Sequence, residues 1–383
     1  AEEQAKAAED AAKDQEDAAE DAAKEASSNS GKGSDDQGSS SAMRSIASEE
    51  NPEFDAKGFP ARRGEIVGLD MSPATRDTLV ARGFRIVQET RLPALDAKLT
   101  RLGVPRGMPA NEALTLVRTL DSKGSYDLAH YYGLNVGVAG VAYGSLPARP
   151  KSIKGSLRIR MIDTGVSTHP MLKGTTLETR AFLSGGPSPT LHGTAIASLL
   201  ASNGASRIVS ASVFRGTAGE PFTSADALMQ ALEWMVERDV SVINISLAGP
   251  RNTILDALIR RSIKAGHAIV AAAGNGGPAA PPAYPAAVPG VVAVTAVDRQ
   301  THVYRYANQG AYISFSAYGV GVPAAAPGGK VSGFTGTSFA TPFVAAVLAR
   351  CATSIKGDAL TACIKGMERT ARRRDRRQGA RHQ

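Results

Sequence analysis

The sequence lacks what several classes of protein require. It has no apolar run of about 18 residues or more, which argues against a membrane-spanning helix. No pair among its six histidines has the spacing of metal ligands, so no zinc site is expected. The formal net charge is +8, but no basic stripe interleaved with aromatic residues accompanies it. Nucleic acid is therefore not expected as a partner.

Cysteine is also scarce. Only Cys351 and Cys363 are present, and an even number in an exported protein favours one disulfide over a pair of buried thiols. The chain begins at Ala1 and not at Met, as a precursor does after losing its leader, although a chosen sequence boundary leaves the same start. We expect a secreted or periplasmic protein.

The composition divides the chain into five segments. Residues 1–60 are of low complexity, rich in Ala, Glu, Ser and Gly, and are expected to be mobile. Residues 61–135 predict a small α+β domain with the order βαββαβ, a ferredoxin-like pattern. Residues 136–155 are a linker with a candidate processing region. Alternating strands and helices in residues 156–366 predict an α/β domain with a doubly wound parallel sheet, and residues 367–383 form a basic tail.

Three motifs in the α/β segment carry the groups of nucleophilic catalysis. Asp163 ends a predicted buried strand before Thr-Gly, His192 begins an apolar helix before Gly-Thr, and Ser338 lies in Gly-Thr-Ser-Phe-Ala-Thr-Pro. A serine hydroxyl needs a base within hydrogen-bond reach, and the base needs a third group to fix its tautomer. Each residue alone also fits a turn or a helix cap. Together, in the order Asp, His, Ser, they predict a catalytic triad.

Two further segments fit a peptide-cleaving site. Asn275 follows a strongly apolar strand, where its side-chain amide could donate to a developing oxyanion, although Asn-Gly is also a common turn pair. Ser246, Leu247, Ala248 and Gly249 end another predicted strand. Exposed backbone at such a place can pair with an extended peptide.

These residues resemble the subtilisin-like serine proteases, the subtilases, over roughly residues 155–350. The resemblance implies a subtilisin-like fold and a serine endopeptidase that acts on protein or peptide substrates. It also implies that Asp163, His192 and Ser338 form the triad, that Asn275 is the oxyanion donor, and that residues 246–249 form one wall of the substrate cleft. Ala248 stands where Gly is common in the family, which would narrow that cleft.

The 61–135 segment resembles the inhibitory propeptide of such proteases. This implies a zymogen in which the propeptide is an intramolecular inhibitor, with residues 131–134 (Tyr-Tyr-Gly-Leu) in or near the active site. No cofactor is expected, with calcium as the one alternative left open. Calcium binds many family members, but the insertion that usually holds it is missing, because residues 202–206 lead straight to the next predicted strand.

Two alternatives remain open at this point. Asp-Thr-Gly is also the signature of aspartic proteases, but only one copy is present and the α/β pattern does not suit that class. The fold could also be a catalytically silent binding scaffold that its own N-terminal domain covers.

Overall fold

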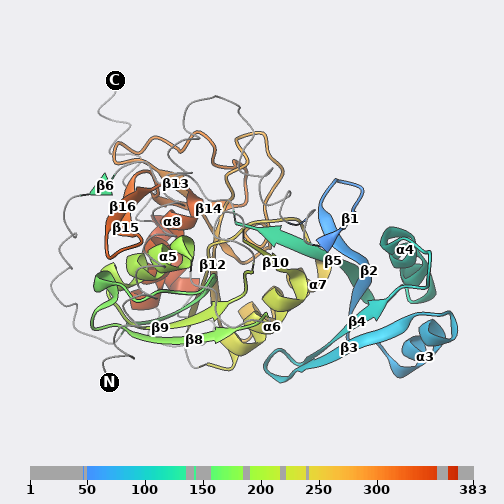
Figure 1. Ribbon diagram of the computed structural model, residues 1–383. Coiled ribbons are helices and arrows are strands. Elements are labelled where there is room, and N and C mark those ends of the chain that lie inside the picture. Colours follow the sequence, from blue (N-terminus) through green and yellow to red (C-terminus); the bar gives the residue numbers. More distant parts are fainter. Residues whose placement is uncertain are drawn as a thin grey trace, which may run out of the picture.

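The computed structural model describes residues 50–134, 157–183, 190–215, 221–238, 241–351 and 361–369, together with Ile46 and the strand Ala142–Tyr143. The chain forms a small α+β unit and a larger α/β unit that lie side by side (Figure 1). Across these described ranges, no helix has both the length and the apolar character needed to cross a bilayer.

The small unit is an antiparallel sheet with two helices on one face. Its elements are β2 (Pro60–Leu69), α3 (Pro73–Ala81), β3 (Arg85–Leu92), the 3₁₀ turn η1 (Pro93–Leu95), β4 (Ala97–Gly103), α4 (Ala110–Leu120) and β5 (Ser125–Gly133). The strands lie in the order β5-β2-β4-β3, so the chain follows the ferredoxin-like βαββαβ path that the sequence predicts. Ser72 caps α3 by accepting a hydrogen bond from Thr75 N at 3.0 Å, and Gly83 turns the chain after it with φ +86°.

Ordered structure begins earlier than the sequence suggests. The short strand β1 (Glu53–Phe54) pairs with the start of β2. The Glu53 carboxylate accepts hydrogen bonds from Gly64 N at 3.0 Å and Ala110 N at 2.7 Å. The expectation that residues 1–60 are mobile throughout is therefore wrong for residues 50–60. A two-residue strand is too short to produce a periodic pattern, and its polar partners are distant in sequence.

The large unit is built on a seven-stranded sheet in which every pairing is parallel. Its strands are β7 (Leu157–Asp163), β8 (Thr176–Ala181), β9 (Ala205–Ser212), β11 (Val242–Ile245), β12 (Ala268–Ala272), β13 (Val292–Val297) and β14 (Ile313–Tyr318). They lie in the order β14-β13-β12-β11-β7-β9-β8. This is the doubly wound sheet that the alternation of strands and helices predicts.

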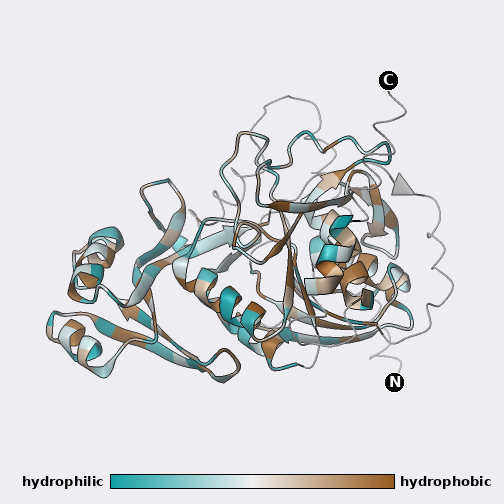
Figure 2. Ribbon diagram, turned by 180° about the vertical axis from the view of Figure 1, so that it is seen from behind, coloured by the Kyte–Doolittle hydropathy of each residue, from teal (hydrophilic) through white to brown (hydrophobic). Residues whose placement is uncertain are grey.

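Helices cover both faces of this sheet. They are α5 (Leu191–Ser202), α6 (Ala225–Val236), α7 (Thr253–Lys264) and α8 (Thr337–Cys351). On β11, Ile243 and Ile245 share a core with α6 and α7, whereas Val242 belongs to the core of α5 and α8. Successive side chains of a strand point to opposite faces, so the sheet separates two cores. Brown, the hydrophobic colour, is accordingly prominent in the strands of the large unit, while α3 and α4 of the small unit show both brown and teal (Figure 2).

Shorter elements complete the large unit. They are the 3₁₀ turn η2 (Pro170–Leu172), β10 (Phe222–Ser224), and a small antiparallel sheet of β15 (Val322–Ala325), β16 (Val331–Phe334) and β6 (Ala142–Tyr143). Residues 361–369 are helical, and Met367 packs against the core of α5 and α8. The basic tail therefore does not begin at residue 367 as predicted, because that residue still contributes to the packed structure.

The small unit docks on α6 and α7. On β2 and β4, Ile66 and Leu102 pack with α3 and α4, while Val67, Leu69 and Leu99 face the other way and join the core of α6 and α7. Both faces of the small sheet are thus covered, one by its own helices and one by helices of the large unit (Figure 1).

At the docking face, each unit supplies a carboxylate that accepts hydrogen bonds from the other unit. Glu233 of α6 accepts hydrogen bonds from Ala94 N at 2.7 Å and Leu95 N at 3.0 Å, at the start of η1. In return, Asp127 of β5 accepts hydrogen bonds from Thr253 N at 2.6 Å and Thr253 Oγ1 at 2.9 Å, at the start of α7. A carboxylate at a helix N-terminus is favourable because free N–H groups point at it.

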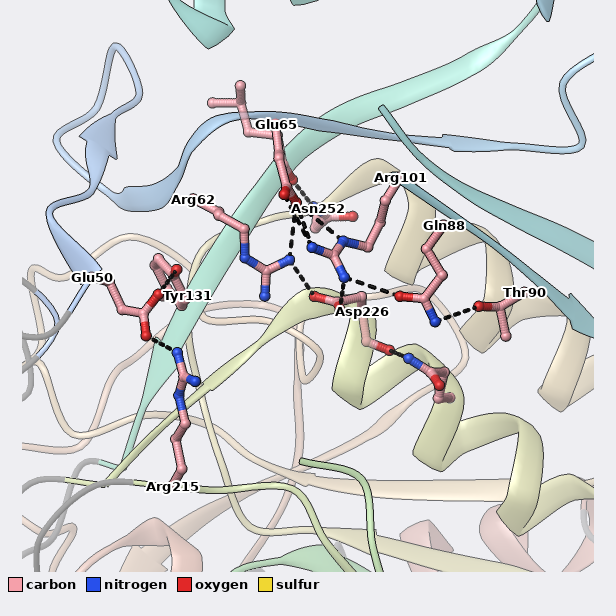
Figure 3. A network of polar contacts seen from close by, with 12 residues as sticks. Glu50, Arg62, Glu65, Gln88, Thr90, Arg101, Tyr131, Arg215, Asp226 and Asn252 are labelled. Atoms are coloured by element: carbon pink, nitrogen blue, oxygen red, sulfur yellow. Dashed lines mark hydrogen bonds and ion pairs between the residues drawn. The ribbon is translucent and has the colours of Figure 1, made fainter. Parts of the chain in front are cut away.

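An ion-pair network extends this face. Arg62 and Arg101 of the small unit lie 3.3 and 3.8 Å from Asp226 in the first turn of α6. Glu65 joins the two arginines, at 3.2 Å from Arg62 and 2.8 Å from Arg101 (Figure 3).

Candidate active site

Asp163 and His192 are hydrogen-bonded to each other. Asp163 is the last residue of β7 and is buried, and its Oδ1 accepts from Thr164 N at 2.7 Å and from His192 Nδ1 at 2.8 Å. We assign the hydrogen of this bond to Nδ1, with the carboxylate oxygen of Asp163 as its acceptor. This leaves Nε2 as the basic nitrogen, and no described residue hydrogen-bonds to it.

The glycine after His192 explains why the two motifs meet. A Cβ on Gly193 would lie 2.5 Å from Thr164 Oγ1 and 2.7 Å from the carbonyls of Thr164 and Gly165. Instead, Gly193 N donates to Thr164 Oγ1 at 2.9 Å, and Thr190 Oγ1 donates to the same oxygen at 2.7 Å. The start of α5 can approach the turn after β7 only because this position carries no side chain.

Ser338 lies in the first turn of α8, next to Phe339, the residue that His192 contacts. The His192 ring packs on the neighbouring Phe339 ring, with 5.3 Å between their centroids. Ser338 Oγ donates to the carbonyl oxygen of Ser246 at 3.1 Å, so in this state the hydroxyl is directed to the backbone after β11 and not to His192. Catalytic hydrogen bonds are often looser without substrate and tighten when it binds.

Asn275 lies directly against the turn that carries Ser338. Its Oδ1 accepts from Thr337 N and Thr337 Oγ1, both at 3.0 Å. The Nδ2 end faces Gly336, where a Cβ would lie 3.1 Å from it. Gly336 has φ +145°, which further favours glycine there. The amide is therefore held in one orientation next to the Ser338 turn.

The segment after β11 links Ser338 to the docked small unit. The Ser246 hydroxyl contacts Thr341 Oγ1 at 2.8 Å and donates to Ser338 O at 3.2 Å. Leu247 is buried, Ala248 is nearly so, and Gly249 exchanges two backbone hydrogen bonds with Tyr284, of 2.9 and 3.0 Å. The structure thus brings all the predicted triad, oxyanion and cleft residues to one region.

The last strand of the small unit occupies this region as well. β5 pairs antiparallel with β10, with Tyr132 opposite Thr223. The Tyr132 ring covers Gly249 so closely that a Cβ there would lie 2.2 Å from it, and the Tyr132 hydroxyl donates to Pro250 O at 3.2 Å. Burial raises the pKa of Tyr132 well above its ordinary value, so the hydroxyl stays protonated at neutral pH.

The remaining predicted residues lie elsewhere. Cys351, at the end of α8, is bonded to Cys363 in a disulfide. α5 ends at Ser202 and β9 begins at Ala205, so only two residues connect them. In the part of the chain that the structure describes, no three His, Cys, Asp or Glu side chains gather as metal ligands would.

Some contributors to the site were not predicted. The hydroxyls of Thr164 and Thr337 orient the helix starts that carry His192 and Ser338. Both lie within the motifs, and a threonine beside each reactive residue was the available signal. β10 gave no signal, because three residues are too few for a strand pattern.

Sequence comparison finds relatives among the subtilisins. The chain is 30% identical over 243 residues to subtilisin amylosacchariticus from Bacillus subtilis subsp. amylosacchariticus, covering 58% of this chain and 62% of that protein. It is 32% identical over 216 residues to subtilisin Savinase from Lederbergia lenta, covering 53% of this chain and 78% of that one. The chain thus spans slightly less than two thirds of the first relative's length.

Structure comparison finds a similar fold in fervidolysin from Fervidobacterium pennivorans, described as a keratinolytic enzyme related to subtilisin. The TM-score is 0.59 at 18% identity, over 78% of this chain and 55% of that one, a likeness that concerns the fold alone. The subtilase family matches residues 155–379, which is more than half of the sequence and contains the Asp163, His192 and Ser338 motifs. The chain belongs to the subtilase family.

Proposed function

We propose that this protein is a serine endopeptidase made as a self-inhibited precursor. The observation that carries the proposal is the 2.8 Å hydrogen bond between His192 Nδ1 and Asp163 Oδ1, which leaves Nε2 as the nitrogen that can act as a base, on a ring that packs against Phe339, the residue after Ser338. A base so oriented, next to a serine at a helix start, is the arrangement that acyl transfer needs.

In the proposed reaction, Ser338 Oγ attacks the carbonyl carbon of a peptide bond while His192 Nε2 accepts the hydroxyl proton. Asp163 stabilises the imidazolium that forms. The side-chain amide of Asn275 donates to the oxyanion. His192 then gives its proton to the leaving amine, the acyl-enzyme forms, and water hydrolyses it with His192 acting as base again. Peptide chains are the substrates.

The docked strand supports self-inhibition. β5 pairs with β10 as an extended peptide substrate would, and Tyr132 fills the space over Gly249. Ser246, whose carbonyl accepts the Ser338 hydroxyl, is only three residues before Gly249. Because the described part of the small unit ends at Leu134, beside this region, we place the processing bond in the linker that follows it, residues 136–155.

Export is part of the proposal. Disulfides persist in oxidising compartments, and Cys351 is bonded to Cys363. A secreted or periplasmic location is therefore favoured.

The test is to incubate the purified full chain and follow its intact mass and its labelling by a fluorophosphonate. We expect self-cleavage near residue 135, labelling of Ser338, and peptide hydrolysis that Ser338→Ala lowers by about 10⁴-fold or more. Ser332→Ala, which removes a hydroxyl from β16, is the matched control and should behave like the unchanged chain. Processed protein that resists labelling and cleaves no peptide would instead indicate a binding scaffold.

A further inference from the structure

A short segment before β1 contacts the strand that β5 pairs with. Ile46 is almost fully buried and packs in a small cluster of its own with Tyr131 of β5 and Phe222 of β10. The rings of Tyr131 and Phe222 meet edge to face, with centroids 5.7 Å apart and an interplanar angle of 89°. Three regions that are distant in sequence therefore share one apolar contact at the β5–β10 junction.

Glu50 joins the same three regions through polar contacts. The Tyr131 hydroxyl donates to Glu50 Oε2 at 2.7 Å, while Glu50 Oε1 forms an ion pair with Arg215 (Figure 3). The Arg215 guanidinium in turn lies over the Phe222 ring, 5.1 Å from its centroid. One carboxylate is thus bonded to a side chain from each unit.

The backbone of Arg215 also pairs with β10. Its backbone exchanges hydrogen bonds of 3.0 and 2.9 Å with Phe222, forming an isolated antiparallel bridge. The backbone of Arg215 therefore fixes the strand that receives β5, and its side chain binds the segment that precedes β1. A contact with Arg215 acts directly on the junction.

The junction itself is short enough for such a contact to matter. β5 and β10 share three residue pairs, and β10 is the edge strand of the sheet that β5 and β2 continue. Hydrogen bonds to ionised groups are among the stronger polar contacts. The ion pair with Arg215 and the hydrogen bond from Tyr131 are therefore substantial additions to a pairing of three residues.

We propose that Ile46 and Glu50 form a latch on a surface made by Arg215 and Phe222, and that this latch keeps β5 paired with β10. Its occupants are Ile46 and Glu50 of this same chain, and its importance for latency rests on the proposed function of the cleft. Opening the cleft then requires two events, release of the docking face on α6 and α7 and release of the latch. A cut between Glu50 and β1 weakens the second contact while the βαββαβ unit stays intact.

The test uses the full chain with Ser338→Ala, so that no self-cleavage occurs, and measures hydrogen exchange at residues 131–133 and 222–224. Glu50→Ala and Arg215→Ala should each raise exchange there by about tenfold, as the loss of a charge-assisted hydrogen bond does. The double variant should be no worse than the more severe single one. The charge swap Glu50→Arg with Arg215→Glu should restore most of the protection.

Two controls separate the latch from general effects. Glu178→Ala removes ion pairs of 2.9 Å with Arg207 and 3.2 Å with Arg238 and should leave exchange at 222–224 unchanged. Tyr131→Phe keeps the ring on Phe222 but removes the hydroxyl bond to Glu50, so its effect should be smaller than that of Glu50→Ala. Protection of α8 reports that every variant is folded.

A second measurement restores Ser338 and follows how quickly peptidase activity develops. Glu50→Ala should shorten this delay, and the charge swap should lengthen it again. If exchange at 131–133 and 222–224 does not respond to either single variant, or the swap does no better than the singles, the latch is wrong whatever the activity. If exchange responds as expected but no variant ever hydrolyses peptide, the latch stands and the proposed function fails.

Discussion

The two main sheets of this protein are covered in different ways. The seven-stranded sheet has both faces covered by helices of its own unit, α5 and α8 on one side and α6 and α7 on the other. The small sheet covers one face with its own helices α3 and α4, but its other face is covered by α6 and α7 (Figure 1). The helices α6 and α7 therefore cover one face of each sheet.

This difference teaches where the small unit depends on the large one. A sheet needs its apolar face buried, so removal of α6 and α7 would expose Val67, Leu69 and Leu99 to water. The large sheet loses nothing comparable when the small unit leaves, because its helices remain. We infer that docking contributes more to the order of the small unit than to that of the large one.

The largest expected effect separates the two faces of the small sheet. Leu99→Ala and Leu102→Ala each remove a buried side chain, and each should cost about 2–5 kcal/mol. In the full chain with Ser338→Ala, Leu99→Ala should speed hydrogen exchange at Ala94 and Leu95, whose N–H groups bind Glu233. Leu102→Ala should instead speed exchange in α3 and α4. Equal loss of protection at both places in both variants would remove the distinction between the faces.

The same comparison shows what the sequence could predict. The capping residue Ser72 and the stop at Gly83 predict where α3 begins and ends, and local signals of this kind predict the βαββαβ order. The motifs of Asp163, His192 and Ser338 predict the site for the same reason. In contrast, Glu50 and Arg215 carry no local signal, since their meaning depends on residues more than 80 positions away. Glu233 was not singled out either, although it stands between the apolar residues Leu232 and Trp234.

An intermediate effect tests the polar part of the shared helices. Glu233→Ala leaves the N–H groups of Ala94 and Leu95 without their acceptor, which should weaken docking by about 1–3 kcal/mol. The matched control is Glu237→Ala, which removes an exposed carboxylate one turn later on the same helix and should cost little. The measurement is the urea midpoint of the small unit's unfolding in the full chain with Ser338→Ala. Equal midpoints for the two variants would mean that Glu233 does not support docking.

The smallest expected effect is the pH dependence of that contact. Burial raises the pKa of Glu233 in the docked state, although the N–H groups of Ala94 and Leu95 oppose the shift, and the neighbouring Glu237 adds to it. Once the small unit leaves, Glu233 faces water and its pKa returns toward the ordinary value of about 4.3. A group whose pKa is higher in the docked state favours docking when protonated. Its contribution is fully present below the undocked pKa and is lost as pH rises through the docked pKa.

Acidification through this range should therefore strengthen the Glu233 contact and not release it. The measurement is the difference in unfolding free energy between Glu233→Gln and the unchanged residue, taken at several pH values in the Ser338→Ala chain. The contributions of other titrating groups cancel in this difference. Asp55 is one of them: burial would raise its pKa, but hydrogen bonds from His130 and two backbone N–H groups lower it. The unfolding free energy of the chain with Glu233 should rise relative to that of the Glu233→Gln variant as pH falls. If this difference in unfolding free energy instead fell as pH falls, the ionised carboxylate of Glu233 would bind η1 more strongly than burial disfavours its charge. The helices α6 and α7 would then attract the small unit by charge as well as by apolar contact.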